Sequence, residues 1–110
     1  MNTYTKKELA EILIKHSLFI ETDGAEGVRA DFNNANLTNV NFSNAILRYA
    51  DFSKADLTDT NFTNAYLYGA NFTNAILTNA ILTNANLGGV TISPKQQEDL
   101  VNALDVKYSS

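Results

Sequence analysis

The chain has 110 residues, of which 45% are hydrophobic and 18% charged, with a net charge of −4 and no cysteine. This length and composition predict one folded domain with a core, and the lack of cysteine excludes disulfides and thiolate chemistry. Because the lysines and arginines are scattered, we expect no basic surface for direct nucleic-acid binding.

The N-terminal segment, residues 1–29, is predicted to cap the rest of the chain. Residues 5–8 (TKKE) read as a capping box that opens a helix running to about His16 or Ser17. Residues 18–21 (LFIE) then predict a short strand, and residues 22–24 a turn. The segment has no continuous apolar stretch typical of a secretory signal. With no run of about 18 apolar residues to span a bilayer, we expect a cytoplasmic protein without membrane contact.

From Ala30 to Pro94 a large apolar residue occupies every fifth position, with a small residue two places before it, as in NFTNAILTNAILTNANL at 71–87. In a helix, at about 100° per residue, anchors five apart would wind around the axis. In a flat strand, alternate anchors would lie on opposite faces. A chain that turns a corner every five residues buries all anchors together, which predicts a solenoid. The anchors are Phe32, Leu37, Phe42, Leu47, Phe52, Leu57, Phe62, Leu67, Phe72, Leu77, Leu82, Leu87 and Ile92.

The repeat follows the pattern A-[DN]-[LF]-[ST]-[NKD], which resembles the pentapeptide-repeat family. The resemblance implies a right-handed, four-sided β-helix with four repeats per coil, so residues 30–93 would form about three coils. At the implied spacing of twenty residues, like anchors share a column, as Phe32, Phe52 and Phe72 do. Stacked rings of this kind would fill a narrow interior.

The C-terminal segment, residues 94–110, is predicted to be a second helical cap followed by a tail. Ser93 stands at an N-cap position, Pro94 at the first helical position and Gln96 two residues later, which predicts a helix over about 94–104. The predicted fold is therefore an all-β solenoid with short α-helical caps at both ends, because open β-helix ends invite association.

Residues with obvious chemistry are scarce. His16, the single histidine, lies on the apolar stripe of the predicted helix, where a packed, hydrogen-bonded histidine is expected rather than a base or ligand. Asp31 and Asp51 would stack in one column, where two solvated surface acids are favoured over a cation site. We expect no enzymatic activity, catalytic residue, metal, cofactor or small-molecule substrate.

Two alternative functions follow from the family and from the surface. Some pentapeptide-repeat proteins inhibit or protect DNA gyrase by imitating duplex DNA, so the resemblance raises a topoisomerase-modulating role. Residues 30–93 hold only four aspartates against one arginine and one lysine, and about three coils of about 4.8 Å reach half a DNA turn. Columns of threonine, such as Thr38, Thr58 and Thr78, raise a remote ice-binding alternative, although threonine also suits strands.

One side of the predicted coil departs from the consensus in every turn. Its outward positions hold Ile46, Arg48, Tyr49, Tyr66 and Tyr68, followed in the last turn by Gly88 and Gly89. Aromatic residues and arginine are enriched at protein interfaces, so this patch predicts a binding site for an unidentified protein partner. Two alternatives stay open: a terminal cap, most plausibly the C-terminal helix, covers the patch, or the patch joins two copies in a homodimer. Gly88 and Gly89 lack side chains, which we interpret as allowing the backbone of another segment to approach closely below the tyrosines. The predicted function is a non-enzymatic protein-interaction or scaffold module.

Overall fold

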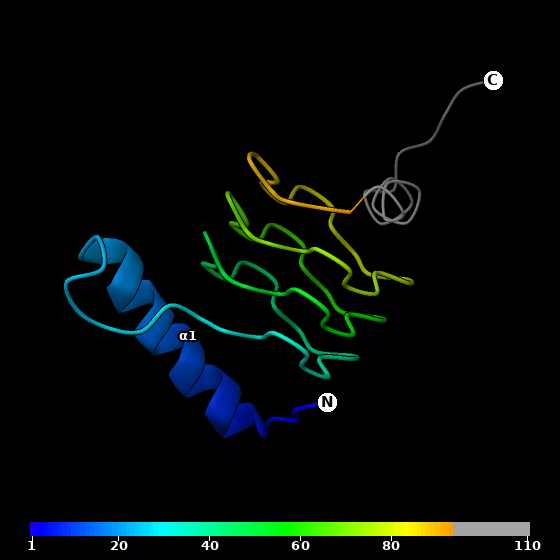
Figure 1. Cartoon of the computed structure of the whole chain (residues 1–110), viewed down its shortest axis with the longest axis horizontal. Helices are drawn as coiled ribbons and strands as arrows, with labels where there is room; N and C mark the ends of the chain where they lie inside the picture. Colours follow the sequence, from blue (N-terminus) through cyan, green and yellow to red (C-terminus); the bar gives the residue numbers. More distant parts are fainter. Residues whose placement is uncertain (94–110) are drawn as a thin grey trace.

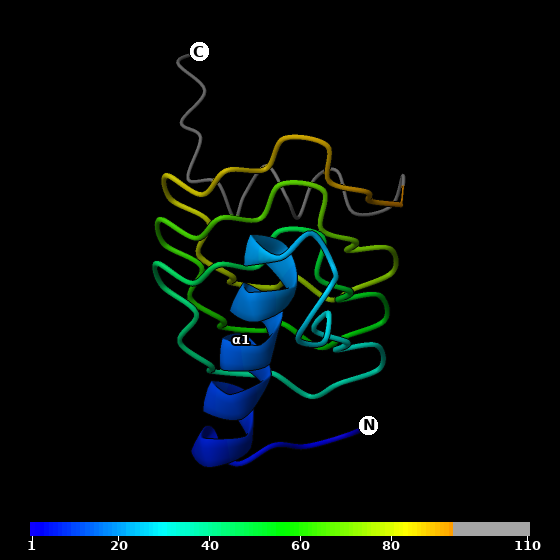
Figure 2. The same ribbon diagram turned by 90° about the vertical axis from the view of Figure 1, so that its left-hand side faces the viewer.

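The computed structural model describes residues 1–93, which form helix α1 (Lys6–Glu21) and a stack of coils (Figure 1). α1 lies across the N-terminal end of the stack, and its C-terminal end extends past the coils (Figures 1 and 2). The cap expected at 94–110 lies outside the described residues. Within residues 1–93, no helix has the length and hydropathy that crossing a bilayer requires.

Parallel β-bridges connect each coil to the next, and every bridge within the stack joins residues twenty positions apart. The four columns of bridges are Asp31 with Asp51, Asn71 and Thr91; Asn36 with Asp56 and Ile76; Asn41 with Asn61 and Ile81; and Ile46 with Tyr66 and Asn86. At one such bridge the Phe32 N–H donates to the Asp51 carbonyl at 2.7 Å, and the Asp51 N–H donates to the Ala30 carbonyl at 3.1 Å. These columns confirm the twenty-residue register.

The corners of the coil depend on residues that tolerate a left-handed backbone. Asn34, Asn44 and Asn64, for example, have φ values of 57°, 63° and 59°, a region that asparagine enters more readily than most residues. Each corner is closed by a short hydrogen bond, such as that from the Ala35 N–H to the Phe32 carbonyl at 3.1 Å. The corner therefore favours asparagine, although Tyr49, Lys54 and Asp59 adopt the same positive φ at equivalent positions.

Asp and Asn side chains on the outside of the coil support the backbone locally. The Asp51 Oδ1 accepts hydrogen bonds from the Ser53 N–H at 2.8 Å and from the Ser53 hydroxyl at 2.6 Å. Asp56 makes the same pair of bonds with Thr58. These Asx turns explain why an acid or amide comes before the anchor and Ser or Thr after it.

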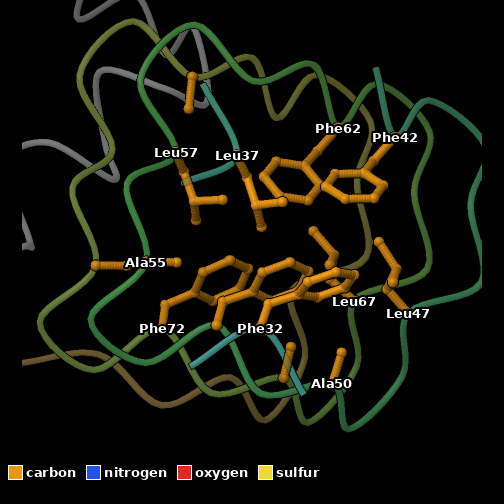
Figure 3. Close-up of a cluster of buried hydrophobic side chains, with 14 of the residues drawn as sticks. Phe32, Leu37, Phe42, Leu47, Ala50, Ala55, Leu57, Phe62, Leu67 and Phe72 are labelled. Carbon is orange, nitrogen blue, oxygen red and sulfur yellow. The ribbon is translucent and has the colours of Figure 1, made fainter. Parts of the chain in front are cut away.

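The interior is filled by four columns of anchors (Figure 3). The ring of Phe52 stacks on Phe32 at a centroid distance of 5.3 Å and on Phe72 at 5.2 Å. Phe42 and Phe62 form a second stack at 5.5 Å, and the two stacks meet edge-on across the interior. All five rings are buried, so the predicted columns form the core.

Helix α1 begins as predicted but ends later. The Thr5 hydroxyl accepts from the Glu8 N–H and the Glu8 carboxylate accepts from the Thr5 N–H, which is the predicted capping box. The strand predicted at residues 18–21 is wrong, because these residues form the last turn of the helix. Phe19 stacks on His16 one turn earlier, and the Thr22 hydroxyl caps the Leu18 carbonyl at 2.7 Å. The turn predicted at 22–24 follows directly.

His16 fastens α1 to the first coil and is fully buried. The Ala30 N–H donates to its Nδ1 at 2.9 Å, so the proton sits on Nε2, which donates to the Arg48 carbonyl at 2.8 Å. Burial lowers the pKa of His16 from its usual 6.5, an effect partly opposed by the hydrogen bond to the Arg48 carbonyl and reinforced by the positive charge of Arg29. The prediction of a packed, hydrogen-bonded histidine is confirmed.

The residues before α1 add a cover that the sequence did not reveal. Asn2 forms a parallel bridge with Ala35, and its carbonyl accepts from the Asn36 N–H at 2.7 Å. Tyr4 then packs its ring edge-on against Phe32 at 5.8 Å. The N-terminal segment thus covers both the backbone edge and the aromatic core of the first coil.

Candidate protein-interaction face

The five residues singled out on one side of the coil form a single exposed surface, which we name the tyrosine face. Ile46 and Tyr66 are bridge partners on neighbouring coils, Tyr49 meets Tyr68 edge-on at 5.9 Å, and the Arg48 guanidinium lies 5.7 Å from the Tyr66 ring centre. The exposed fractions of Ile46, Tyr49, Tyr66 and Tyr68 are 38%, 49%, 46% and 45%. The described part of the chain therefore leaves this face open to solvent.

The glycines on this side accommodate the tyrosine rings. A Cβ atom on Gly69 would lie 2.5 Å from the Tyr49 ring, and one on Gly88 would lie 2.9 Å from the Tyr68 ring. Tyr49 and Tyr68 thus each lie over a glycine of the next coil. The interpretation of Gly88 as room for another backbone is wrong, because the ring of Tyr68 already occupies that space.

A groove of about 720 Å³ runs between the tyrosine face and the end of α1, and we name it the helix-end groove. It is lined by Phe19 of α1, by Asp23 and Arg29 of the following loop, and by Arg48, Tyr49 and Tyr68 of the coils. The alternative that a terminal cap, most plausibly the C-terminal helix, covers this face lies outside the described residues; within residues 1–93 the end of α1 borders the face. Since the helix was predicted to end near residue 17, its last turn was not expected to reach the coil side.

The sequence reasoning missed two further exposed apolar residues. Ile76 and Ile81 replace the outward Asp or Asn in the third coil and are 46% and 45% exposed. They continue the columns of Asn36 and Asn41, on two other sides of the stack. The signal was present, since the same replacement of Asp or Asn marked Ile46 and Tyr66.

The remaining candidates have structural roles. Asp31 and Asp51 are bridge partners, and each accepts a hydrogen bond from a backbone N–H two residues on. Within residues 1–93, no group of three or more His, Asp or Glu side chains is arranged to hold a metal ion. The tyrosine face therefore supports binding to another molecule through its shape, aromatic surface and charge.

Coils that stack through parallel β-bridges twenty residues apart define the class of solenoid repeat proteins. The family model for pentapeptide repeats matches residues 28–64 and 55–93 in 8 copies, which is more than half of the chain. The protein therefore belongs to the pentapeptide-repeat family.

Solved structures of other family members resemble the chain. HetL from the cyanobacterium Nostoc, a pentapeptide repeat protein involved in heterocyst differentiation regulation, is 35% identical with a TM-score of 0.55, over 56% of this chain and 29% of HetL. A pentapeptide repeat protein of the Arabidopsis thaliana thylakoid lumen is 31% identical with a TM-score of 0.48, over 69% of this chain and 60% of that one. A comparison with curated proteins found no significant match.

Proposed function

We propose that this protein is a non-enzymatic interaction and scaffold module whose tyrosine face binds a protein partner. The observation that carries the proposal is the half-exposed cluster of Tyr49, Tyr66, Tyr68 and Arg48 on a rigid stack of coils. Tyrosine and arginine contribute strongly to interface hot spots because they join apolar area to polar groups. A solenoid presents such groups with little loss of conformational freedom on binding.

The proposal includes a division of the chain into three parts. Residues 1–29 cover the N-terminal end and residues 30–93 form a four-sided stack of about three coils, while the third part, the cap expected at residues 94–110, lies outside the described residues. A cytoplasmic location belongs to the same proposal, because a chain without cysteine is compatible with a reducing compartment.

The surface chemistry favours this function over the alternatives. A DNA mimic needs a dense array of surface carboxylates, but residues 30–93 hold only four aspartates against one arginine and one lysine. An ice-binding array needs outward hydroxyls, but those of Thr58 and Thr63 donate to neighbouring Asp56 and Asn61 side chains at 2.6 Å. These features make both alternatives less favourable than protein binding through the tyrosine face.

The test is the double variant Tyr66→Ser and Tyr68→Ser. We expect it to lose partner capture from native lysate, or self-association in sedimentation, while its melting temperature stays within a few degrees. The matched control is Ile76→Ser with Ile81→Ser, which removes similarly exposed apolar residues from other sides. If the tyrosine variant melts far lower with association unchanged, or if only the isoleucine variant loses association, the tyrosine face is not the binding surface.

A further inference from the structure

The helix-end groove is lined by positively charged side chains, although the chain as a whole is acidic. Arg29 and Arg48 are the only two arginines in the sequence, and both line this groove although they belong to different elements. Neither forms an ion pair within the described residues, and the Arg48 guanidinium lies over the Tyr66 ring. Among residues 1–93, Asp23 is the single carboxylate that lines the groove. The groove is therefore net positive on a protein whose overall charge is −4.

The groove walls are apolar on both sides of this charge. Phe19 contributes from α1, while Tyr49 and Tyr68 contribute from the coils. The two tyrosines meet edge-on and rest over glycines of the next coil, so their rings are held in position before any partner arrives. The site thus combines fixed aromatic surface with two guanidinium groups.

The coil surface beside the groove also offers unused backbone donors. On other sides the N–H two residues after an Asp or Asn donates to that side chain, as Ser53 does to Asp51 at 2.8 Å. Ile46 and Tyr66 replace this acceptor, so the N–H groups of Arg48 and Tyr68 have no acceptor within residues 1–93. An external carboxylate or carbonyl oxygen can accept hydrogen bonds from these N–H groups. A carboxylate is favoured, because its negative charge also interacts with the Arg48 guanidinium.

We propose that the helix-end groove binds an acidic segment of a partner protein, in which carboxylates flank an aromatic or aliphatic side chain. This inference rests on the proposed role of the tyrosine face in binding protein. The carboxylates would meet Arg29, Arg48 and the free N–H groups, and the apolar side chain would lie against Phe19 and the tyrosines. A different protein suits the groove better than a second copy, because two chains of net charge −4 repel each other.

The experiment titrates the full-length protein with synthetic peptides. One peptide carries Asp and Glu around a central Phe-Leu pair, and its control carries Asn and Gln at the same positions. We expect the acidic peptide to bind at least about tenfold more tightly at low salt, to shift the amide resonances of Arg48 and Tyr68, and to weaken as salt rises. Equal affinities, or no binding of the acidic peptide, would overturn the inference.

Charge variants separate this inference from the proposed function. Arg29→Gln should lower the affinity for the acidic peptide about threefold or more, and Asp23→Asn should raise that affinity by a similar factor. Lys54→Gln, which removes a positive charge from a residue that does not line the groove, should leave the affinity unchanged. If Arg29→Gln and Asp23→Asn have no effect although the tyrosine double variant loses its partner, the acidic-segment inference fails and the proposed function stands.

A second copy as occupant gives a different result. Self-association that is lost in Arg29→Gln and is not displaced by the acidic peptide would overturn the inference in favour of a homodimer. Conversely, if the tyrosine double variant keeps its partner, the proposed function fails whatever the charge variants show.

Discussion

Replacing Phe52 with alanine tests how the core is held together. Its ring is fully buried, stacked between Phe32 and Phe72 and edge-on to Phe42 and Phe62. Removing a buried phenylalanine costs about 3–5 kcal/mol of unfolding free energy when the cavity cannot collapse. Each lost aromatic pair contributes about 0.5–1.5 kcal/mol beyond the buried area, so the upper end of that range is expected.

The backbone around Phe52 resists collapse into the cavity. The Phe52 N–H donates to the Asn71 carbonyl at 2.8 Å, and its own carbonyl accepts from the Ala55 N–H at 3.0 Å. Both bonds belong to the coil framework, which keeps the neighbouring coils at their spacing. Phe52→Leu should lose roughly half as much stability, since Leu82 occupies an equivalent buried anchor position in a phenylalanine column.

The assay is guanidinium unfolding followed by circular dichroism, with Thr58→Ser as the control. Thr58 lies outside the core, and serine keeps the hydroxyl that bonds Asp56, so its change should stay within about 0.5 kcal/mol. If Phe52→Ala and Thr58→Ser destabilise the protein equally, the stacked column does not carry the stability and the reasoning is refuted.

Three further predictions concern α1, the tyrosine face and the alternative function. His16→Gln should flatten the stability profile below pH 6.5: the buried neutral histidine stabilises the fold above the unfolded pKa, and this contribution is lost as pH falls through the lower folded pKa. Stability measured at pH 7.5 and pH 5 should differ less in the variant, and an unchanged difference would contradict the assignment. Gly69→Ala should cost about 1–2 kcal/mol more than Gly89→Ala, because both have positive φ but only the first places a Cβ against the Tyr49 ring. Equal decreases in melting temperature for the two variants would show that the Tyr49 ring moves freely. DNA supercoiling by gyrase should be unaffected at micromolar protein, and inhibition would revive the DNA-mimic alternative.

The period-five pattern determined which residues are the buried anchors, and the resemblance to pentapeptide repeats supplied the twenty-residue register of the columns. Each anchor is buried by the segment that carries it, and identical segments stack on one another, so local sequence and tertiary position coincide at Phe52 and its neighbours. The tyrosine face could be predicted for the same reason, because a column is a sequence spacing of twenty residues. The capping box at Thr5 was equally readable, since its hydrogen bonds lie within one turn.

The tertiary structure decided what depends on contacts between distant residues. The segment LFIE at residues 18–21 suits a strand by composition, but His16 anchors the helix to Arg48 and Phe19 stacks on His16, so the helix continues to Glu21. That extra turn creates the helix-end groove, which joins α1, a loop and three coils. The packing of the Tyr49 ring over Gly69 could likewise not be predicted from the sequence, because the ring orientation depends on packing between coils. Repeats make tertiary neighbours predictable only within the coils, whereas the docking of α1 depends on side chains outside the period.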